Sequence, residues 1–150
     1  MTQTPVKFED GTTLKDRIAD WTNTYADTLT ENYKQYHVRS MESMSSDWSQ
    51  KQLEDVKNGT ANLMKFVIKT GRKYYKIMQH EAIDYGNPNS DYREGSVHAF
   101  VDKKTGEVYK PASYNAPAKY VRFDMRIINQ REQLHNPFFT GWAGGYLYLR

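Results

Sequence analysis

The first third of the chain repeats apolar residues with the period of an α-helix. Apolar side chains recur every three or four residues at Leu14, Ile18, Trp21, Tyr25, Leu29, Tyr33 and Tyr36. This spacing places them along one side of a helix, and we interpret the stripe as facing a core because an apolar helix side needs cover. Thr13 followed by Asp16 resembles a capping box that begins this helix. A second helix is predicted over residues 47–58, with Ser46 as N-cap and Gly59 after its end.

The middle of the chain alternates with a period of two, which is typical of strands. Residues 62–69 and 72–78 surround Thr70-Gly71 and predict one β-hairpin. Residues 96–101 and 107–110 surround a polar turn and predict a second. The segment between the hairpins, residues 80–95, is predicted to be a long polar loop.

The last part of the chain contains shorter elements. Residues 120–128 fit a strand or a helix, with alternation that favours a strand at the start, and residues 129–135 predict a short helix. Residues 142–149 are apolar and aromatic, and a free tail of this kind would be an exposed apolar patch. We therefore expect this tail to pack as an edge strand on its own sheet, or across the interface of a homo-oligomer.

Together these patterns predict one α+β domain over residues 1–150. Its helical N-terminal part, residues 1–60, packs on a small and mainly antiparallel sheet. Two hairpins and a C-terminal strand form that sheet within residues 61–150. The length is that of one domain and suffices to bury a core.

Composition restricts the setting of the protein. The chain has no Cys, which favours a reducing compartment. Its first residues contain no apolar stretch of a signal peptide, and no apolar run approaches the ~20 residues of a membrane span. We therefore expect a protein that makes no membrane contact and stays in the cytoplasm where it is made.

The sequence offers no pattern typical of catalysis. The four histidines, at positions 37, 80, 98 and 135, have no metal-ligand spacing, and His98 on a strand is interpreted as a partly buried structural residue. There is no Gly-x-Ser-x-Gly motif and no P-loop, and Gly141–Gly145 lies too near the end to open a phosphate-binding unit. The prediction is a protein that is not an enzyme, without catalytic residues, metal or cofactor.

Charge is distributed unevenly along the chain. Residues 1–60 carry 7 Lys and Arg against 10 Asp and Glu, whereas residues 61–126 carry 12 against 7. This basic middle predicts one continuous positive surface that faces a polyanion, although a solvated sheet face would give the same count. The chain also holds 12 Tyr, a residue that suits interfaces and ligand stacking.

The segment after the second hairpin combines these two features. Prolines stiffen the loop from Lys110 to Lys119 and hold Tyr114 between basic residues. An aromatic ring flanked by cations suits a nucleotide or a nucleic-acid phosphate, because a base can stack while the phosphate is neutralised. The predicted ligand-binding residues are Tyr109, Lys110, Tyr114, Asn115, Lys119, Arg122 and Arg126. The alternative is that Tyr114 covers the core and the prolines only turn a corner.

The same region resembles a known group of proteins. The runs Ser96-Val-His-Ala-Phe-Val, Gly106-Glu-Val-Tyr-Lys and Ala112-Ser-Tyr-Asn-Ala-Pro-Ala-Lys, with Arg122, Arg131-Glu and Trp142–Tyr148, are similar to a family of small uncharacterised bacteriophage proteins. In that family an aromatic residue, often Trp, takes the place of Tyr114. The resemblance covers residues 72–150. It implies a phage origin and the cytoplasm of an infected host bacterium, and it supplies no mechanism.

These observations give one leading hypothesis and two alternatives. The leading hypothesis is a small accessory protein that binds a nucleotide or nucleic-acid phosphate stoichiometrically and sequesters a host defence signal. The first alternative is a protein that inhibits a host enzyme, such as a polymerase or nuclease, through exposed Tyr side chains. The second is a virion component that packs against neighbouring copies.

Overall fold

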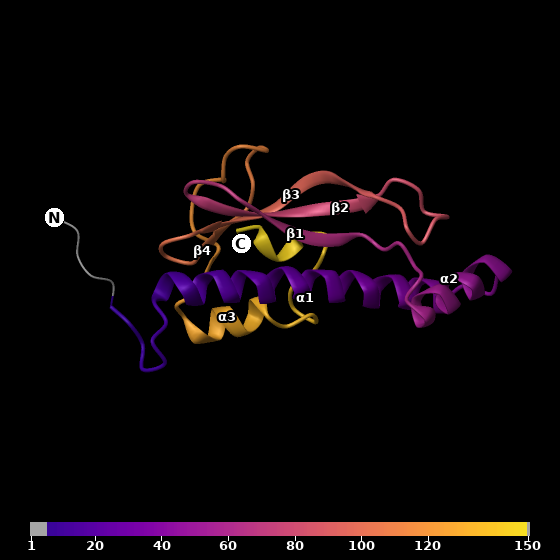
Figure 1. Cartoon of the computed structure of the whole chain (residues 1–150), viewed down its shortest axis with the longest axis horizontal. Helices are drawn as coiled ribbons and strands as arrows, with labels where there is room; N and C mark the ends of the chain where they lie inside the picture. The colour runs from indigo at the N-terminus through magenta and orange to yellow at the C-terminus, as the bar shows by residue number, and fades with distance from the viewer. Residues whose placement is uncertain (1–5, 150) are drawn as a thin grey trace.

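A computed structural model describes residues 6–149, and it contains a long helix packed along one face of a five-stranded antiparallel sheet (Figure 1). The strands lie side by side in chain order, β1 to β5. The helices are α1 (Leu14–Glu42), α2 (Asp47–Asn58) and α3 (Ile128–Leu134). The strands are β1 (Lys65–Thr70), β2 (Tyr74–Ala82), β3 (Tyr92–Asp102), β4 (Glu107–Tyr109) and β5 (Phe123–Asp124). The predicted α+β class is confirmed.

Helix α1 begins where the sequence predicts and continues six residues past the predicted row, to Glu42, while α2 has both of its predicted ends. The Thr13 hydroxyl accepts from the backbone N–H of Asp16, and the Asp16 carboxylate accepts from the backbone N–H of Thr13. Helix α2 begins after Ser46 and ends at Gly59, whose φ of 73° is left-handed. The predicted stripe of α1 faces the sheet, with Ile18, Tyr25 and Leu29 fully buried. Local capping and periodicity therefore determine this half of the fold.

The pairing of β2 with β3 extends further than the alternating pattern predicts. Strands β2 and β3 continue until Ala82 pairs with Tyr92, so the connecting loop spans residues 83–91 rather than 80–95. The Lys65 ammonium lies 4.1 Å from the centroid of the Tyr92 ring, and the Tyr92 hydroxyl donates to the Leu63 carbonyl at 2.9 Å. These cross-strand contacts extend the pairing into a polar segment that resembles a loop in sequence.

A β-bulge in the pairing of β2 with β3 places His98 in the core. The register changes from Ile77 opposite Ala99 to Met78 opposite Val97, which leaves His98 unpaired. The His98 ring lies edge-on to Phe66 with its Nε2 2.7 Å from the Tyr146 hydroxyl. Burial lowers the pKa of His98 to about 4, so the imidazole is neutral in the folded protein at neutral pH.

The prediction that the C-terminal segment forms an edge strand is wrong. Residues Gly145–Leu147 form a 3₁₀-helix, η1, and no strand lies within residues 142–149. Figure 1 shows this segment between the sheet and α1, where Leu147 is buried and Tyr146 packs against the core. A left-handed Gly144, with φ of 82°, turns the chain inward and allows this burial. Tyr146 and Leu147 are thus covered by their own chain, whereas Tyr148 and Leu149 are exposed, and the homo-oligomer stays a prediction.

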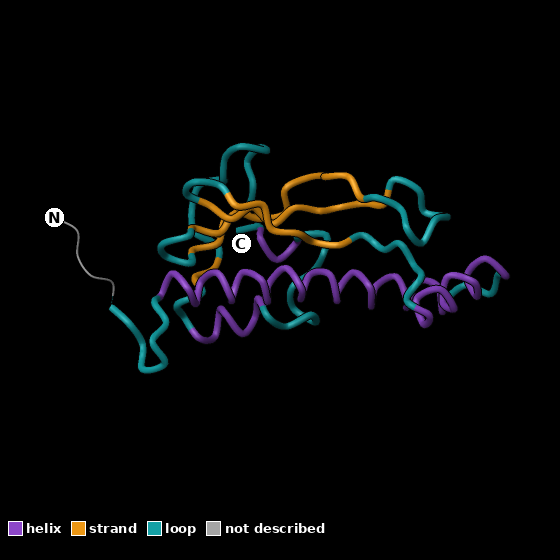
Figure 2. Tube along the Cα trace, in the orientation of Figure 1, coloured by secondary structure: helices purple, strands orange, loops and turns teal. Residues whose placement is uncertain are grey.

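The two faces of the sheet differ. The inner face packs on α1, while the loop of residues 110–122, here named the Tyr114 loop, rises over the opposite, outer face (Figure 2). Helix α3 packs beside α1, and the His135 Nε2 lies 2.9 Å from the Trp21 carbonyl oxygen. No helix within residues 6–149 has the length and apolar character needed to cross a membrane.

Candidate functional site

The Tyr114 loop is a small closed hairpin. The backbone N–H of Ala118 donates to the Lys110 carbonyl at 2.7 Å, and Pro111 pairs with Pro117. Ala112 and Ser113 both donate to the Ala116 carbonyl, which closes the tip. The prolines thus stand at the base of the loop, and the ring of Tyr114 is held at its tip.

Tyr114 lies on the outer face of the sheet. Its hydroxyl donates to a Glu94 carboxylate oxygen at 3.0 Å and accepts from the Lys69 ammonium at 2.8 Å. The Lys76 ammonium lies 4.2 Å from the ring centroid. The side chain is 44% exposed, and none of these three partners belongs to the core between the sheet and α1. The geometry therefore favours a ring available at the surface over a core lid.

The charges around Tyr114 partly neutralise one another. Lys69 and Glu94 form a salt bridge of 3.3 Å. The hydrogen bond from Tyr114, followed by the contact with Lys69, lowers the pKa of Glu94. The hydrogen bond to Tyr114, followed by the contact with Glu94, raises the pKa of Lys69. Lys76 has no salt-bridge partner within residues 6–149, so it is the cation beside the ring that remains available to an anion.

Two of the predicted cations have structural partners. The Arg122 guanidinium donates to the carbonyls of Leu147, Lys119 and Tyr120 at 2.6–2.7 Å, which fastens the C-terminal segment to the Tyr114 loop. Arg126 forms a salt bridge of 2.7 Å with Asp124. This pairing lowers the pKa of Asp124 and raises that of Arg126. Among the described residues, no hydrogen bond or cation–π contact joins either arginine to Tyr114.

The other predicted residues are also dispersed around the loop. The Lys110 ammonium lies 4.7 Å from the ring centroid of Tyr148, and Lys119 and Asn115 are exposed. Tyr109 lies next to Tyr74, with 6.2 Å between their ring centroids. Of the two alternatives that the sequence left open for Tyr114, the geometry favours the surface ring, and the cations that accompany it come from β1 and β2.

A stronger concentration of charge lies at the two hairpin turns. Because β1 to β4 are antiparallel neighbours in chain order, the β1–β2 turn and the β3–β4 turn meet at one end of the sheet. A cavity of about 280 Å³ lies there, here named the basic turn cavity. It is lined by Lys15, Arg72, Lys73, Asp102, Lys103, Lys104 and Thr105.

Hydrogen bonds fix the shape of the basic turn cavity. The Asp102 carboxylate accepts from the backbone N–H groups of Lys104 and Thr105, and Gly106 completes the turn with a φ of 75°. The backbone N–H of Lys103 donates to the Lys73 carbonyl at 3.0 Å, which joins the two turns. An Asx-type turn and a glycine thus present the lysine side chains from a rigid backbone.

Positive charge dominates the basic turn cavity. None of its five cations, Lys15, Arg72, Lys73, Lys103 and Lys104, has a salt-bridge partner among the described residues. Its one acid, Asp102, is nearly buried and bonded to backbone amides. Sequence reasoning missed this cluster, although basic residues in both predicted turns and the antiparallel order were visible signals.

The charge distribution refines the predicted positive surface. Within residues 61–126, three cations pair with acids of the same segment: Lys69 with Glu94, Arg93 with Glu81 and Arg126 with Asp124. The prediction of one continuous positive surface is therefore too broad. Four of the segment's cations without a salt-bridge partner among the described residues, Arg72, Lys73, Lys103 and Lys104, lie together at the hairpin turns.

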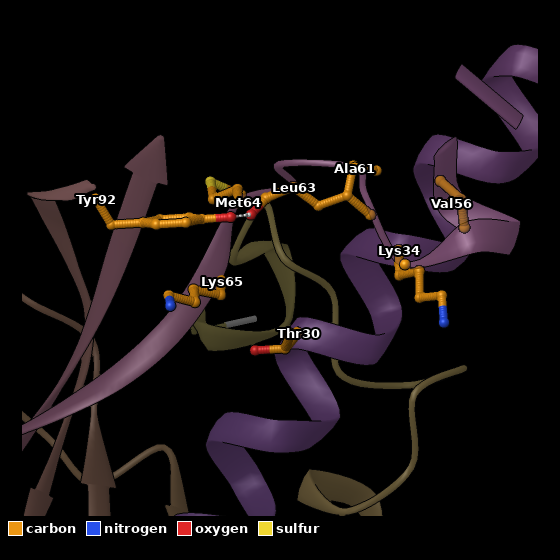
Figure 3. Close-up of a pocket in the computed structure, with 9 residues that line it drawn as sticks. Thr30, Lys34, Val56, Ala61, Leu63, Met64, Lys65 and Tyr92 are labelled. Carbon is orange, nitrogen blue, oxygen red and sulfur yellow. Dashed lines mark hydrogen bonds between the residues drawn. The ribbon is translucent and has the colours of Figure 1, made fainter. Parts of the chain in front are cut away.

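A further cavity, of about 220 Å³, lies along the edge of β1 (Figure 3). The hydroxyl of Thr30 donates to the Ala26 carbonyl and accepts from the backbone N–H of Phe66, so it joins this edge strand to α1. Lys34 and Lys65 extend in opposite directions. The polar groups of this cavity thus hold the fold together. In the part of the chain that the structure describes, no cluster of three or more His, Asp or Glu could hold a metal ion.

A family model described as "Family of unknown function (DUF7717)" matches residues 5–149, which include the N-terminal helices as well as the sheet. No curated protein and no solved structure matches the chain.

Proposed function

We propose that this chain, which belongs to DUF7717, a family of unknown function, binds the phosphates of a nucleic-acid strand or nucleotide. The observation that carries this proposal is the basic turn cavity, where five cations without acidic partners surround a space of about 280 Å³. Clustered Lys and Arg side chains attract phosphates for two reasons. The nucleic acid releases its counterions when the cations neutralise its phosphates, and the bound phosphates reduce the repulsion among the cations.

The outer face of the sheet connects this cavity with Tyr114. The Lys73 ammonium lies 5.3 Å from the ring centroid of Tyr74, which in turn packs edge-on against Phe100. Lys76 lies near both Phe100 and Tyr114, at 5.7 Å and 4.2 Å from their ring centroids. Phe100 itself is buried beneath this strip, so Tyr74 and Tyr114 are the rings that a base can reach. Two such rings with lysines between them suit a single strand, whose bases stack while its phosphates follow the lysines. This strip favours a nucleic-acid strand over a lone nucleotide.

The first prediction concerns the charges of the basic turn cavity. Replacing Lys73 and Lys104 together by Gln should weaken binding of a fluorescent single-stranded oligonucleotide, measured by anisotropy. The slope of log K against log salt concentration should become shallower by about 0.7 for each phosphate that the variant no longer neutralises. The matched control is Lys51→Gln with Lys57→Gln on α2, which should leave both quantities unchanged. Equal losses in the two double variants, or no salt-dependent binding in the wild type, would refute the proposal.

The second prediction concerns Tyr114. Tyr114→Ala should weaken oligonucleotide binding by ~1–3 kcal/mol, the usual contribution of a base–aromatic stack, whereas Tyr114→Trp should be tolerated. The melting temperature of Tyr114→Ala should differ little from that of the wild type, because the ring is half-exposed and outside the core. The control Tyr36→Ala removes a ring of matched exposure, 45%, from α1. A Tyr114→Ala protein that melts much lower and binds as tightly as wild type would assign the ring a structural role.

The setting of this activity is part of the same proposal. If the resemblance to bacteriophage proteins reflects the origin of the chain, the protein acts in an infected host and occupies a nucleic acid or sequesters a nucleotide signal. Anisotropy with a labelled nucleotide in place of the oligonucleotide distinguishes these two ligands. Tighter binding of the nucleotide would favour sequestration.

A further inference from the structure

We propose a second binding site, for an uncharged planar nitrogen-containing ring, in the cavity between α1, α2 and the loop of residues 83–91. The cavity measures about 460 Å³, which is within the range of small-molecule sites. It is larger than the basic turn cavity, at about 280 Å³, and no sequence motif points to it. Its main side chains are Tyr33, His37, Trp48, Gln52, Asn62 and Tyr85.

The aromatic side chains of this cavity come from three separate elements. On α1, Tyr33 and His37 stack with 26° between their planes, and Trp142 packs edge-on against Tyr33 at 5.2 Å. These contacts hold the α1 wall in place. Trp48 from α2 and Tyr85 from the loop are 56% and 68% exposed, so two large rings at the cavity are available for stacking. Exposed aromatic rings beside a cavity provide contact area for a planar ligand at a small entropic cost.

Polar groups in the same cavity can recognise the edge of a ring. The Nε2 atom of His37 is buried and has no hydrogen-bond partner within the described chain. Burial lowers the pKa of His37, which keeps the imidazole neutral and able to donate or accept according to its tautomer. An unpaired buried nitrogen costs free energy, so a ligand that displaces the side chains covering it is stabilised by the hydrogen bond that it supplies. Gln52 adds an amide that can donate and accept.

The charge of the cavity selects the class of ligand. None of its lining residues is Lys or Arg, and its one acid, Asp55, forms a salt bridge of 3.7 Å with Lys51. A phosphate would find no counter-charge here, whereas a neutral heteroaromatic ring meets rings and amides. The floor is also preformed, since the Asn62 amide donates to the carbonyls of Asp84 and Asn87 and fixes the loop. The site is therefore chemically distinct from the phosphate site proposed above.

Adenosine, an uncharged nucleoside, is a suitable probe. Titrated into the full chain and followed by ¹H–¹⁵N NMR, it should shift the indole N–H signal of Trp48 saturably. Trp48→Ala and Tyr85→Ala, both at exposed positions, should each weaken binding about tenfold, read from backbone signals of α1. His37→Phe keeps a ring and removes both nitrogens, so a loss of affinity in this variant assigns a hydrogen bond to His37.

Two controls separate this site from the proposed function. Tyr148→Ala removes an exposed ring elsewhere, and the double variant Lys73→Gln with Lys104→Gln removes cations of the phosphate site; both should bind adenosine as the wild type does. No saturable shift at millimolar adenosine, or undiminished affinity after Trp48→Ala, would overturn the inference. Either result would leave the oligonucleotide experiment unaffected, because that experiment measures different residues.

Discussion

A chain that ends at Phe139 is expected to be largely unfolded at room temperature. It lacks Leu147, which is fully buried, and truncation of one buried leucine to Ala alone costs about 2–5 kcal/mol. It also lacks Tyr146, whose hydroxyl contacts both the Tyr25 hydroxyl and the His98 Nε2 in the core. Because total stability is about 5–15 kcal/mol for a typical domain, these losses together remove most of it. Circular dichroism and urea unfolding measure the result directly.

The control for this truncation is a chain that ends at Tyr148. It keeps Leu147 and the carbonyl that accepts from Arg122 at 2.7 Å, and among described residues it loses only the exposed Leu149. We expect its midpoint in urea to match that of the full chain. The urea midpoint of the single variant Leu147→Ala should lie between those of the full chain and the chain that ends at Phe139. If the chain ending at Phe139 melts like the full chain, the segment does not contribute to the core as described.

This segment also shows which parts of the fold could be read from the sequence. The first two helices were predictable because each carries its own N-cap, Thr13 for α1 and Ser46 for α2, and a local apolar period. The C-terminal segment has neither. Its burial depends on the space between the sheet and α1, and on Asn32, whose side-chain Oδ1 accepts from the backbone N–H of Trp142 at 2.9 Å. Contacts across more than a hundred residues leave no local pattern to read.

The candidate site divides in the same way. Tyr114 was recognisable because two prolines and nearby cations surround it in the sequence itself. Its actual partners, Lys69 and Lys76, belong to β1 and β2, and only strand pairing brings them beneath the loop. Arg122 looked like a phosphate contact because its charge was visible and its three carbonyl acceptors were not. A basic residue near an aromatic one in the sequence thus predicts a phosphate-binding surface only when the fold leaves the N–H donors of the basic residue free.

The basic turn cavity was within reach of sequence reasoning. Both hairpins were predicted, and neighbouring antiparallel hairpins place alternate turns at one end of a sheet. Arg72 with Lys73, and Lys103 with Lys104, occupy those two turns. Predicting the cavity requires placing the β1–β2 turn beside the β3–β4 turn in space, whereas a count of charge along the chain does not. Net charge over a segment does not distinguish residues that pair with acids from those that remain unpaired.

Acid should destabilise the protein through His98. Burial lowers its pKa from 6.5 in the unfolded chain to about 4 in the fold, so the folded state favours the neutral ring. This contribution is complete above pH 6.5, where the ring is neutral in both states. As the pH falls from 6.5 towards 4 the unfolded chain binds a proton that the folded chain does not, and the free energy of unfolding should decrease by about 3 kcal/mol. Urea unfolding at a series of pH values measures this decrease.

The variant His98→Gln isolates the contribution of this one ring. Its amide can still meet the Tyr146 hydroxyl but does not titrate, so its stability should fall less steeply between pH 6.5 and pH 4. Burial also lowers the pKa values of His37 and His135, and both remain in the two proteins, so their effects cancel in the difference between the curves. That difference should grow as the pH falls and level off below about pH 4. Parallel curves of unfolding free energy against pH would show that His98 takes up a proton as readily in the folded state as in the unfolded state. In that case the bulge would not exclude water from the imidazole.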